Sequence, residues 1–337
     1  AMEQAAILTP DGEIRPRDLP DRVRNALPRE QAASAGDVSS ARTFREAKRE
    51  VVEGFERAYL NDLMDRHGGN VTAAAQQMLR FVSQLEIQMG RRLDMDRLSE
   101  VVELSARASR LWSEILQVAQ TVPSPLTFFD TLIHVAPMVL MRGTPEAVEY
   151  YSILKAELEE RVAQHVAAVP GERFRFYWEG PPIWCAPRPL SELFMNHGVS
   201  VVGSTYGEVL DLDSLDAKNT IESMARAYTS IFTNRSDSYK VAYLAAKMRE
   251  YGVDGVIHHE GRTAPEHSNV RYGLELKLRR ATGVRAIVIE ADTHDLRLFS
   301  MDRVMRRLED FIEIHESASS RGGARTHSGR GGGAADG

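Results

Sequence analysis

The spacing of apolar residues changes once along this chain, near Gly171, and divides it into two parts. From Thr43 to about Val166, apolar residues recur at three- and four-residue steps, which predicts amphipathic helices. After Gly171, short apolar runs alternate with helical stretches and short turns. This alternation is typical of α/β proteins, so we expect an all-helical region followed by a doubly wound parallel sheet.

The apolar runs of the second part predict the strands of that sheet, in a flavodoxin-like arrangement. The clearest runs are Phe174 to Trp178, Val199 to Val202 and Gly255 to Ile257, and a fourth precedes Glu290. Helices are expected over Leu190 to His197, Asn219 to Tyr228, Ser236 to Tyr251 and from near Asn269. Ligands of such sheets bind beyond the carboxyl ends of the strands. The predicted loop His258 to Asn269 and the acidic run Glu290 to Asp295 are therefore expected to share one crevice.

Breaks in the helical pattern predict the limits of segments. Pro123 and Pro125 end a helix that begins near Asp94, Phe128 to Met141 forms a shorter one, and Thr144 caps the next, which opens with Pro145. The Gly/Ser/Arg-rich end of the chain predicts disorder. The expected segments are 1–24, a linker over 25–42, 43–77, a helical region over 78–170, an α/β domain over 171–316 and a tail over 317–337.

Composition sets outer limits on function. The chain has 337 residues, of which 43% are hydrophobic, so it can bury a large core, and its net charge of -6 gives no overall basic surface for nucleic acid. No apolar run approaches the ~18 residues that a membrane span needs, and no signal pattern opens the chain, which favours a cytoplasmic protein. A single cysteine, Cys185, excludes an intrachain disulfide and a thiolate-only metal cage within this chain.

Polar side chains follow each predicted strand. Because the carboxyl ends of parallel strands meet at one edge, we expect these residues to line a binding site. The alternative is that they cap helices and face water. The candidate substrate-binding residues at these strand ends are Trp178, Glu179, Thr205, Tyr206, Arg262 and Thr263.

Two histidines and two arginines add candidate chemistry near the third strand. Adjacent residues of a strand point to opposite faces, so at most one of His258 and His259 can face the crevice. A hydrogen-bonded structural role competes with metal binding for both, and His259, with Glu290, is the candidate for acid–base chemistry. Arg262 and Arg271 could hold phosphate, with Asn269 at a helix start, or Arg271 could instead pair with Glu290 or Asp292.

The same region carries a family resemblance. The strings HHEGRTAPEHSNVRYG and IEADTHDLRLFS, with RG-x-P-x-x-V-x-Y-Y upstream, resemble the 2-hydroxyacyl-CoA dehydratase and benzoyl-CoA reductase subunit family, most closely its B-type subunit, over about residues 78–316. The resemblance implies an acyl-CoA substrate, a [4Fe-4S] cluster, a homologous second subunit and an ATP-dependent electron activator. It also implies a role in reductive dearomatisation or dehydration, the former in anaerobic aromatic degradation.

One position departs from the family pattern. Where the family reads R/K-T-C-P, with the cysteine as a cluster ligand, this chain has Arg262-Thr263-Ala264-Pro265. A methyl group cannot ligate iron, and one thiol cannot hold a cubane cluster. Cys185 matches no ligand position and is expected to be a buried or half-buried inert thiol. We therefore expect no metal ligand at Ala264 and no cluster held by this chain alone, which leaves open whether it is active as an enzyme.

Residues 1–77 resemble a different family. A segment ending in I-x-P-x-D-L-P, then HGGNVTAAA, resembles the ATPase tail and Fis-type helix-turn-helix of sigma-54-dependent transcriptional activators. Asn70 and Thr72 are candidate DNA contacts, but the recognition helix is missing, so DNA binding is expected to be weak or absent. The alternative function is a regulator fragment joined to an acyl-CoA-binding domain, dimerising through Thr43 to His67. A third possibility is an unselected fusion near Gln76.

Overall fold

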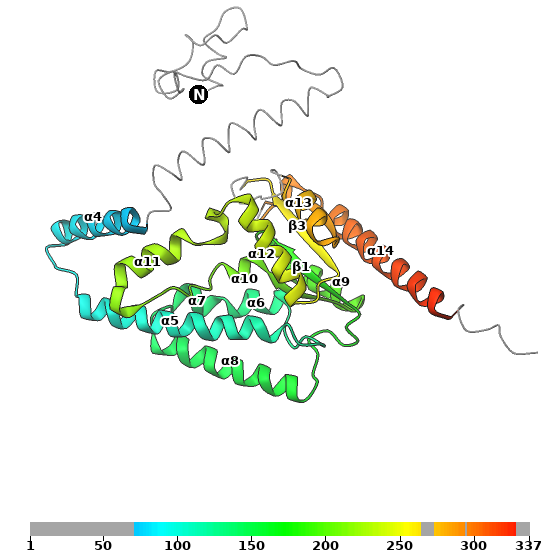
Figure 1. Cartoon of the computed structure of the whole chain (residues 1–337), viewed down its shortest axis with the longest axis horizontal. Coiled ribbons are helices and arrows are strands. Elements are labelled where there is room, and N and C mark those ends of the chain that lie inside the picture. Colours follow the sequence, from blue (N-terminus) through cyan, green and yellow to red (C-terminus); the bar gives the residue numbers. More distant parts are fainter. Residues whose placement is uncertain (1–70, 264–272, 294, 328–337) are drawn as a thin grey trace, which may run out of the picture. The chain divides into compact units, whose positions relative to one another are not determined.

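The computed structural model describes residues 71–263, 273–293 and 295–327 (Figure 1). All of them belong to the second of the two compact units of the chain, residues 63–337. The predicted helices and linker before residue 71, the DNA-contact candidate Asn70, and Ala264, Asn269 and Arg271 lie outside the described residues.

Four parallel strands form the sheet, and its order confirms the doubly wound prediction. The strands are β1 (Phe174–Glu179), β2 (Val199–Ser204), β3 (Gly255–Gly261) and β4 (Arg285–Ala291), arranged as β2-β1-β3-β4. From β1 the chain passes through α9 (Pro187–Asn196) to β2. It then returns through α12 (Asp237–Glu250) to β3, and α13 (Leu274–Thr282) leads on to β4. The direction of winding therefore reverses between β1 and β3.

The third strand is longer than its apolar run. Residues 258 to 261, expected in a loop, continue β3, and each pairs with a residue of β4, from His258 with Val288 to Gly261 with Ala291. The predicted end of this strand was wrong because it was placed where the apolar residues stop. Polar side chains remain in a buried strand when they have hydrogen-bond partners, as both histidines do here.

The two faces of the sheet support two apolar cores. Tyr177 and Val256 face a core with α5 (Met95–Val118), α8 (Pro145–Ala163), α12 and α13. Phe176, Trp178 and Ile257 face the other, with α9 and α14 (Met301–His327). Neighbouring residues of a strand alternate between the cores, as the two-residue period of a strand requires. Both faces are covered, which is the condition for a stable all-parallel sheet.

Helices α5 and α8 lie side by side and contribute to the core on the first face of the sheet (Figure 1). The rings of Trp112 and Tyr151 lie 5.4 Å apart at this contact, and Trp112 Nε1 donates to the carbonyl of Gly207 at 2.9 Å. The described helices include none that is long and apolar enough to cross a bilayer. The remaining α-helices of the described residues are α4 (Val71–Met89), α6 (Phe128–His134), α7 (Ala136–Leu140), α10 (Thr205–Glu208) and α11 (Thr220–Thr229).

Helix ends follow the capping residues with three exceptions. Thr144 caps α8 as predicted, and Ser236, the expected first residue of its helix, caps α12. Asn219 was also expected to begin a helix, but its amide donates to Asp216 and does not cap α11. The predicted helix over 128–141 divides into α6 and α7, because Pro137 has no N–H for the carbonyl of Ile133. The segment 317–327, expected to lack structure, continues α14 as helix.

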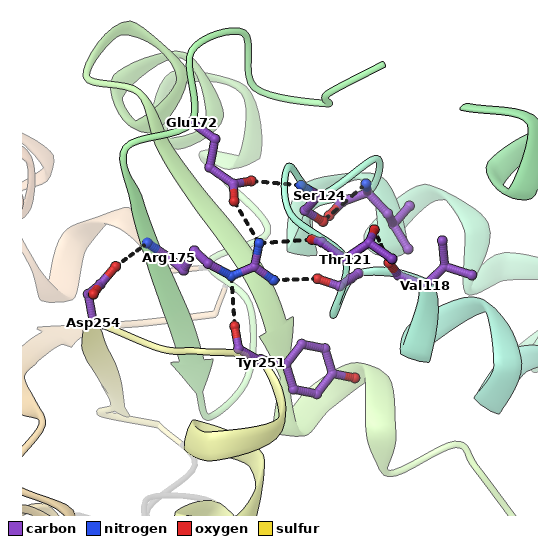
Figure 2. A network of polar contacts seen from close by, with 9 residues as sticks. Val118, Thr121, Ser124, Glu172, Arg175, Tyr251 and Asp254 are labelled. Atoms are coloured by element: carbon purple, nitrogen blue, oxygen red, sulfur yellow. Dashed lines mark hydrogen bonds and ion pairs between the residues drawn. The ribbon is translucent and has the colours of Figure 1, made fainter. Parts of the chain in front are cut away.

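A buried arginine joins the helical region to the amino end of the sheet (Figure 2). Arg175 of β1 donates to the carbonyls of Ala119, Thr121 and Tyr251 at 2.6, 3.0 and 2.7 Å. It also donates to Glu172 Oε1 at 2.6 Å. Ala119 and Thr121 follow the end of α5 and Tyr251 follows α12, so a single guanidinium satisfies free carbonyls at two helix ends. The candidate site lies at the opposite end of the strands, the carboxyl edge of the sheet.

Candidate functional site

The carboxyl edge of the sheet has its switch point between β1 and β3, where the winding reverses. In open α/β sheets ligands bind in the crevice at such a point. The strands there end at Glu179 and Gly261, and Thr205 begins α10 at the end of β2.

A buried acid–base pair lies at the switch point. Glu179 and His258 are register partners on adjacent strands, and His258 Nδ1 lies 3.0 Å from Glu179 Oε2. Their side chains are 1% and 0% exposed. His258 Nε2 is also buried and has no hydrogen-bond partner in the described part of the chain. When Nδ1 carries a proton it donates to the carboxylate, which leaves Nε2 as the unused ring nitrogen.

A buried lysine adds a third titratable group. Lys240 of α12 is 9% exposed, and its ammonium lies 5.7 Å from the centre of the Phe232 ring. Burial lowers the pKa of Lys240, and the nearby carboxylates of Asp237 and Glu179 oppose that effect. Carboxylate, imidazole and ammonium groups therefore gather beneath the carboxyl edge. We name Glu179, His258 and Lys240 the switch-point cluster.

The turn after β1 fixes the geometry beside this cluster. Gly180 has a φ of +104°, and a Cβ there would lie 2.7 Å from the carbonyl oxygen of His259, so only glycine fits. Its N–H donates to Thr205 Oγ1 at 3.0 Å. The carbonyl of Pro181 accepts from Trp178 Nε1 at 3.0 Å and contacts His259 Nδ1 at 2.7 Å. The turn is thus attached to β1, to β3 and to the start of α10.

His259 and Trp178, both predicted site residues, belong to the packing of that turn. His259 is 0% exposed, and burial lowers its pKa, which favours the neutral ring. The Trp178 ring stacks on Phe128, with the ring centres 5.2 Å apart. His258 and His259 are both hydrogen-bonded within the fold, as the structural interpretation of the two histidines expects. No group of three metal-ligating side chains occurs within the described ranges.

The outer part of the edge connects β3 to β4. Thr263 donates to Asp292 Oδ2 through its backbone N–H at 3.0 Å and its hydroxyl at 2.6 Å. Arg262 pairs with Glu290 at 2.8 Å, and both side chains are about half exposed, at 47% and 55%. Glu290 therefore lies on the surface in an ion pair. Its predicted catalytic partner His259 is in the interior.

The second strand brings Thr205 and Tyr206 to the edge. Thr205 is buried, while Tyr206 is half-buried with its ring 5.9 Å from that of Trp184. Of the predicted site residues, the structure thus brings Glu179 and Thr205 to the switch point. Sequence reasoning missed Lys240 and the pairing of His258 with Glu179. A lysine on the apolar face of a helix was the available signal for Lys240.

The residues present do not fit a [4Fe-4S] cluster. Such a cluster is held by several cysteine thiolates, and Cys185 is the single cysteine of the chain. Its expected burial was wrong: Cys185 is exposed in the turn before α9, because Trp184 and Ala186, and not the thiol, point into the apolar core. One exposed thiol cannot replace a set of ligands.

Comparison with known proteins identifies a family that this chain matches. Residues 46–315 match the model of the 2-hydroxyglutaryl-CoA dehydratase D-component, and the match begins before the boundary expected at residue 78. The B-type subunit of benzoyl-CoA reductase from Thauera aromatica is 30% identical over 243 residues, 68% of this chain and 56% of that protein.

Two further relatives align with similar fractions of this chain and of their own lengths. The (R)-2-hydroxyisocaproyl-CoA dehydratase alpha subunit of Clostridioides difficile is 28% identical over 237 residues, 70% of this chain and 58% of that protein. The lactoyl-CoA dehydratase alpha subunit of Anaerotignum propionicum is 29% identical over 244 residues, 72% of this chain and 58% of that protein. The chain therefore spans a little over half the length of these relatives.

Proposed function

Because the chain belongs to the 2-hydroxyglutaryl-CoA dehydratase D-component family, we propose that it is a subunit that binds an acyl-CoA thioester at the carboxyl edge of its sheet. The names of its relatives include a benzoyl-CoA reductase and a lactoyl-CoA dehydratase. The observation that carries the proposal is the switch-point cluster of Glu179, His258 and Lys240, which places buried charge where such folds bind ligands.

The energetics of buried charge support a binding role. A buried ion pair is seldom more stable than apolar side chains of similar volume, so the cluster is not explained by stability alone. His258 Nδ1 lies beside the Glu179 carboxylate, which leaves Nε2 for a polar group of the ligand, and the Lys240 ammonium is a hydrogen-bond donor. Donors held in a water-poor site polarise a carbonyl more strongly than they do in water.

We further propose that this chain does not hold an iron–sulfur cluster of its own. Cys185 is the only thiol, and Ala264 stands where the family pattern has a ligand. Anaerobic reconstitution with iron and sulfide, followed by metal and sulfide analysis, tests this point. We expect no stoichiometric cluster on the isolated chain; a cluster at one per chain would overturn the proposal.

A partner subunit follows from the same family. Several relatives are named as subunits, and the resemblance implies a homologous second subunit and an ATP-dependent electron activator. Exposed apolar side chains on α6, α7 and α8 support such association, since Ile133, Val139, Leu140 and Ile153 are each at least 60% exposed. Light scattering of the chain, alone and with a homologous subunit, separates a heteromer from a homodimer. We expect a heteromer, and a chain that stays monomeric with the subunit present would exclude it.

Calorimetric titration with benzoyl-CoA and lactoyl-CoA tests the binding proposal. We expect saturable binding of at least one thioester to the wild-type chain, and about tenfold weaker binding by Lys240→Met, which removes a buried donor. Because burial already disfavours the Lys240 charge, this variant should unfold at the same urea concentration as wild type or higher. Lys155→Met, on the surface of α8, is the matched control and should bind as wild type does.

The titrations test acyl-CoA binding and the role of the switch-point cluster separately. Absence of saturable binding of both thioesters would remove the proposed function. Wild-type affinity in Lys240→Met would remove the switch-point cluster from the binding site while leaving acyl-CoA binding itself in place.

A further inference from the structure

A second feature of the carboxyl edge is a cavity of about 460 Å³ between α10, α11 and α12. Its volume is in the range of small-molecule sites. The lining carries charged and hydrogen-bonding side chains, with Glu208 and Lys247 at one part and Arg235 and Tyr239 at another. Neither the switch-point cluster nor the contacts described above account for these groups.

A buried carboxylate in this cavity has one oxygen that accepts no hydrogen bond from the described part of the chain and lies at ion-pair distance from a lysine. Glu208 Oε2 accepts from the hydroxyls of Tyr177 and Tyr243 at 2.8 and 2.7 Å. Glu208 Oε1 is buried and has no hydrogen-bond partner among the described residues; Lys247 Nζ lies 3.9 Å from it, too far for a hydrogen bond. The side chain is 8% exposed. A buried acceptor without a donor costs free energy, which a ligand N–H or O–H would recover.

Two further groups define what the cavity could hold. Asp211 Oδ1 is a second buried acceptor without a hydrogen bond in the described ranges, and it lines the same cavity. Arg235 is exposed, and its guanidinium lies 4.3 Å from the centre of the Tyr239 ring. Stacking holds this guanidinium in place and leaves its N–H groups for an anion. The cavity therefore combines internal acceptors with a cation at its exposed side.

The cavity adjoins the switch-point cluster through two residues. Thr205 lines it and accepts from Gly180, the residue after Glu179. Phe232 also lines it and contacts the ammonium of Lys240 with its ring. A ligand in the cavity could therefore extend one end toward the cluster and the other toward Arg235.

We propose that this cavity takes the amide-bearing pantetheine arm of the acyl-CoA thioester, with amide N–H groups donating to Glu208 and Asp211 and a phosphate contacting Arg235. The inference rests on the proposed function and adds the residues that recognise the carrier. The two buried carboxylate oxygens disfavour the apolar part of an aromatic acyl group, because that group would leave them without donors. The amides of pantetheine supply those donors.

Two ligands, used as probes, distinguish contacts to the amides of the arm from contacts to its phosphates. Benzoyl-CoA carries both amides and phosphates, whereas S-benzoyl-pantetheine carries the amides alone. Arg235→Ala removes a charge-assisted phosphate contact, so we expect about tenfold weaker binding of benzoyl-CoA and unchanged binding of S-benzoyl-pantetheine. Arg226→Ala, which removes an exposed arginine of α11 outside the cavity, is the matched control and should change neither affinity.

Glu208→Gln tests the inner end of the cavity. The two tyrosine hydroxyls donate to one side-chain oxygen, so the glutamine carbonyl should take that position and its NH₂ should replace the free acceptor. We expect about tenfold weaker binding of both probes, because a donor then faces the ligand's N–H. Glu222→Gln, an exposed carboxylate of α11, is the control for the loss of a charge and should leave both affinities unchanged.

A cooperative urea unfolding transition checks that each variant is folded. Ser230→Trp is a further test, because Ser230 lines the cavity and a tryptophan there would fill it. Ser230 is exposed, so its replacement need not disturb the core. We expect this variant to lose binding of both probes. If wild type binds benzoyl-CoA while Arg235→Ala, Glu208→Gln and Ser230→Trp bind it equally well, the cavity assignment is wrong and the proposed function stands. If wild type binds no thioester, both fall together.

Discussion

Nδ1 of His258 lies 3.0 Å from Oε2 of Glu179, although the two residues are 79 positions apart in the chain. Parallel pairing of β1 with β3 places them in register, and both are buried. The pair thus depends on the sheet, and removal of Glu179 leaves Nδ1 of His258 without its partner.

The pair gives the first prediction. Glu179→Leu alone should destabilise the protein by about 1–3 kcal/mol, because it leaves a buried imidazole nitrogen without its hydrogen-bond partner. The double variant Glu179→Leu/His258→Leu should recover most of that loss and still fail to bind acyl-CoA. Urea unfolding and calorimetric titration measure the two effects. A double variant that binds the thioester like wild type would show that the pair serves stability alone.

The Arg175 network in Figure 2 gives the second prediction. Arg175→Ala should cost about 3–5 kcal/mol, since it leaves the buried Glu172 carboxylate unpaired and exposes carbonyls of two helix ends to an apolar interior. Arg175→Lys should recover little, because one ammonium lacks the planar fork that reaches these acceptors.

A neighbouring arginine provides the control for that network. Arg173 pairs with Glu316 at the surface, and its side chain is 52% exposed. Arg173→Ala should change the free energy of unfolding by about 0–1 kcal/mol, as exposed pairs do. Equal losses for Arg173→Ala and Arg175→Ala in urea unfolding would contradict the role assigned to burial.

The turn after β1 gives the third prediction. Gly180→Ala should destabilise the protein by about 1–3 kcal/mol through backbone strain, with a further loss from contact with the His259 carbonyl. Gly171→Ala is the matched control, because Gly171 also has a positive φ, +69°, but a Cβ there meets no atom within 4 Å. The difference between the two variants in urea unfolding isolates the close contact. No difference would mean that the turn moves to make room.

The fourth prediction concerns pH. Burial lowers the pKa of His259 below its usual 6.5, so between the two values the unfolded chain binds more protons than the folded chain. Stability should therefore be lost as pH falls below about 6.5 toward the folded-state pKa, and be fully present above it. His259→Asn, which keeps a donor for Pro181, should show a shallower loss on urea unfolding over the same pH range.

A second histidine must be separated from that effect. Burial also lowers the pKa of His134, so part of the acid sensitivity should remain in His259→Asn. His165→Gln, which changes an exposed histidine, should keep the full wild-type slope. An unchanged slope in His259→Asn would place the sensitivity elsewhere.

The sequence by itself determined the local features of this protein. Short apolar runs identified the strands and the 3.6-residue period most helices, because each depends on neighbouring residues alone. Thr144 was identified as a cap and Ser236 as a helix start for the same reason. The single Cys185 and Ala264 carry the proposal that this chain holds no cluster of its own, and that argument uses residue type alone.

Tertiary structure decided what depends on distant residues. The apolar pattern ended β3 too early, because the partners that keep His258 and His259 in the strand come from β1 and the turn after it. In the sequence, Glu290 and His259 both follow an apolar run, and no local pattern distinguishes the exposed Glu290 from the buried His259. The switch-point cluster and the cavity around Glu208 join separate strands and helices. No local period encodes such a meeting, because strand order and the packing of helices on the sheet bring these residues together.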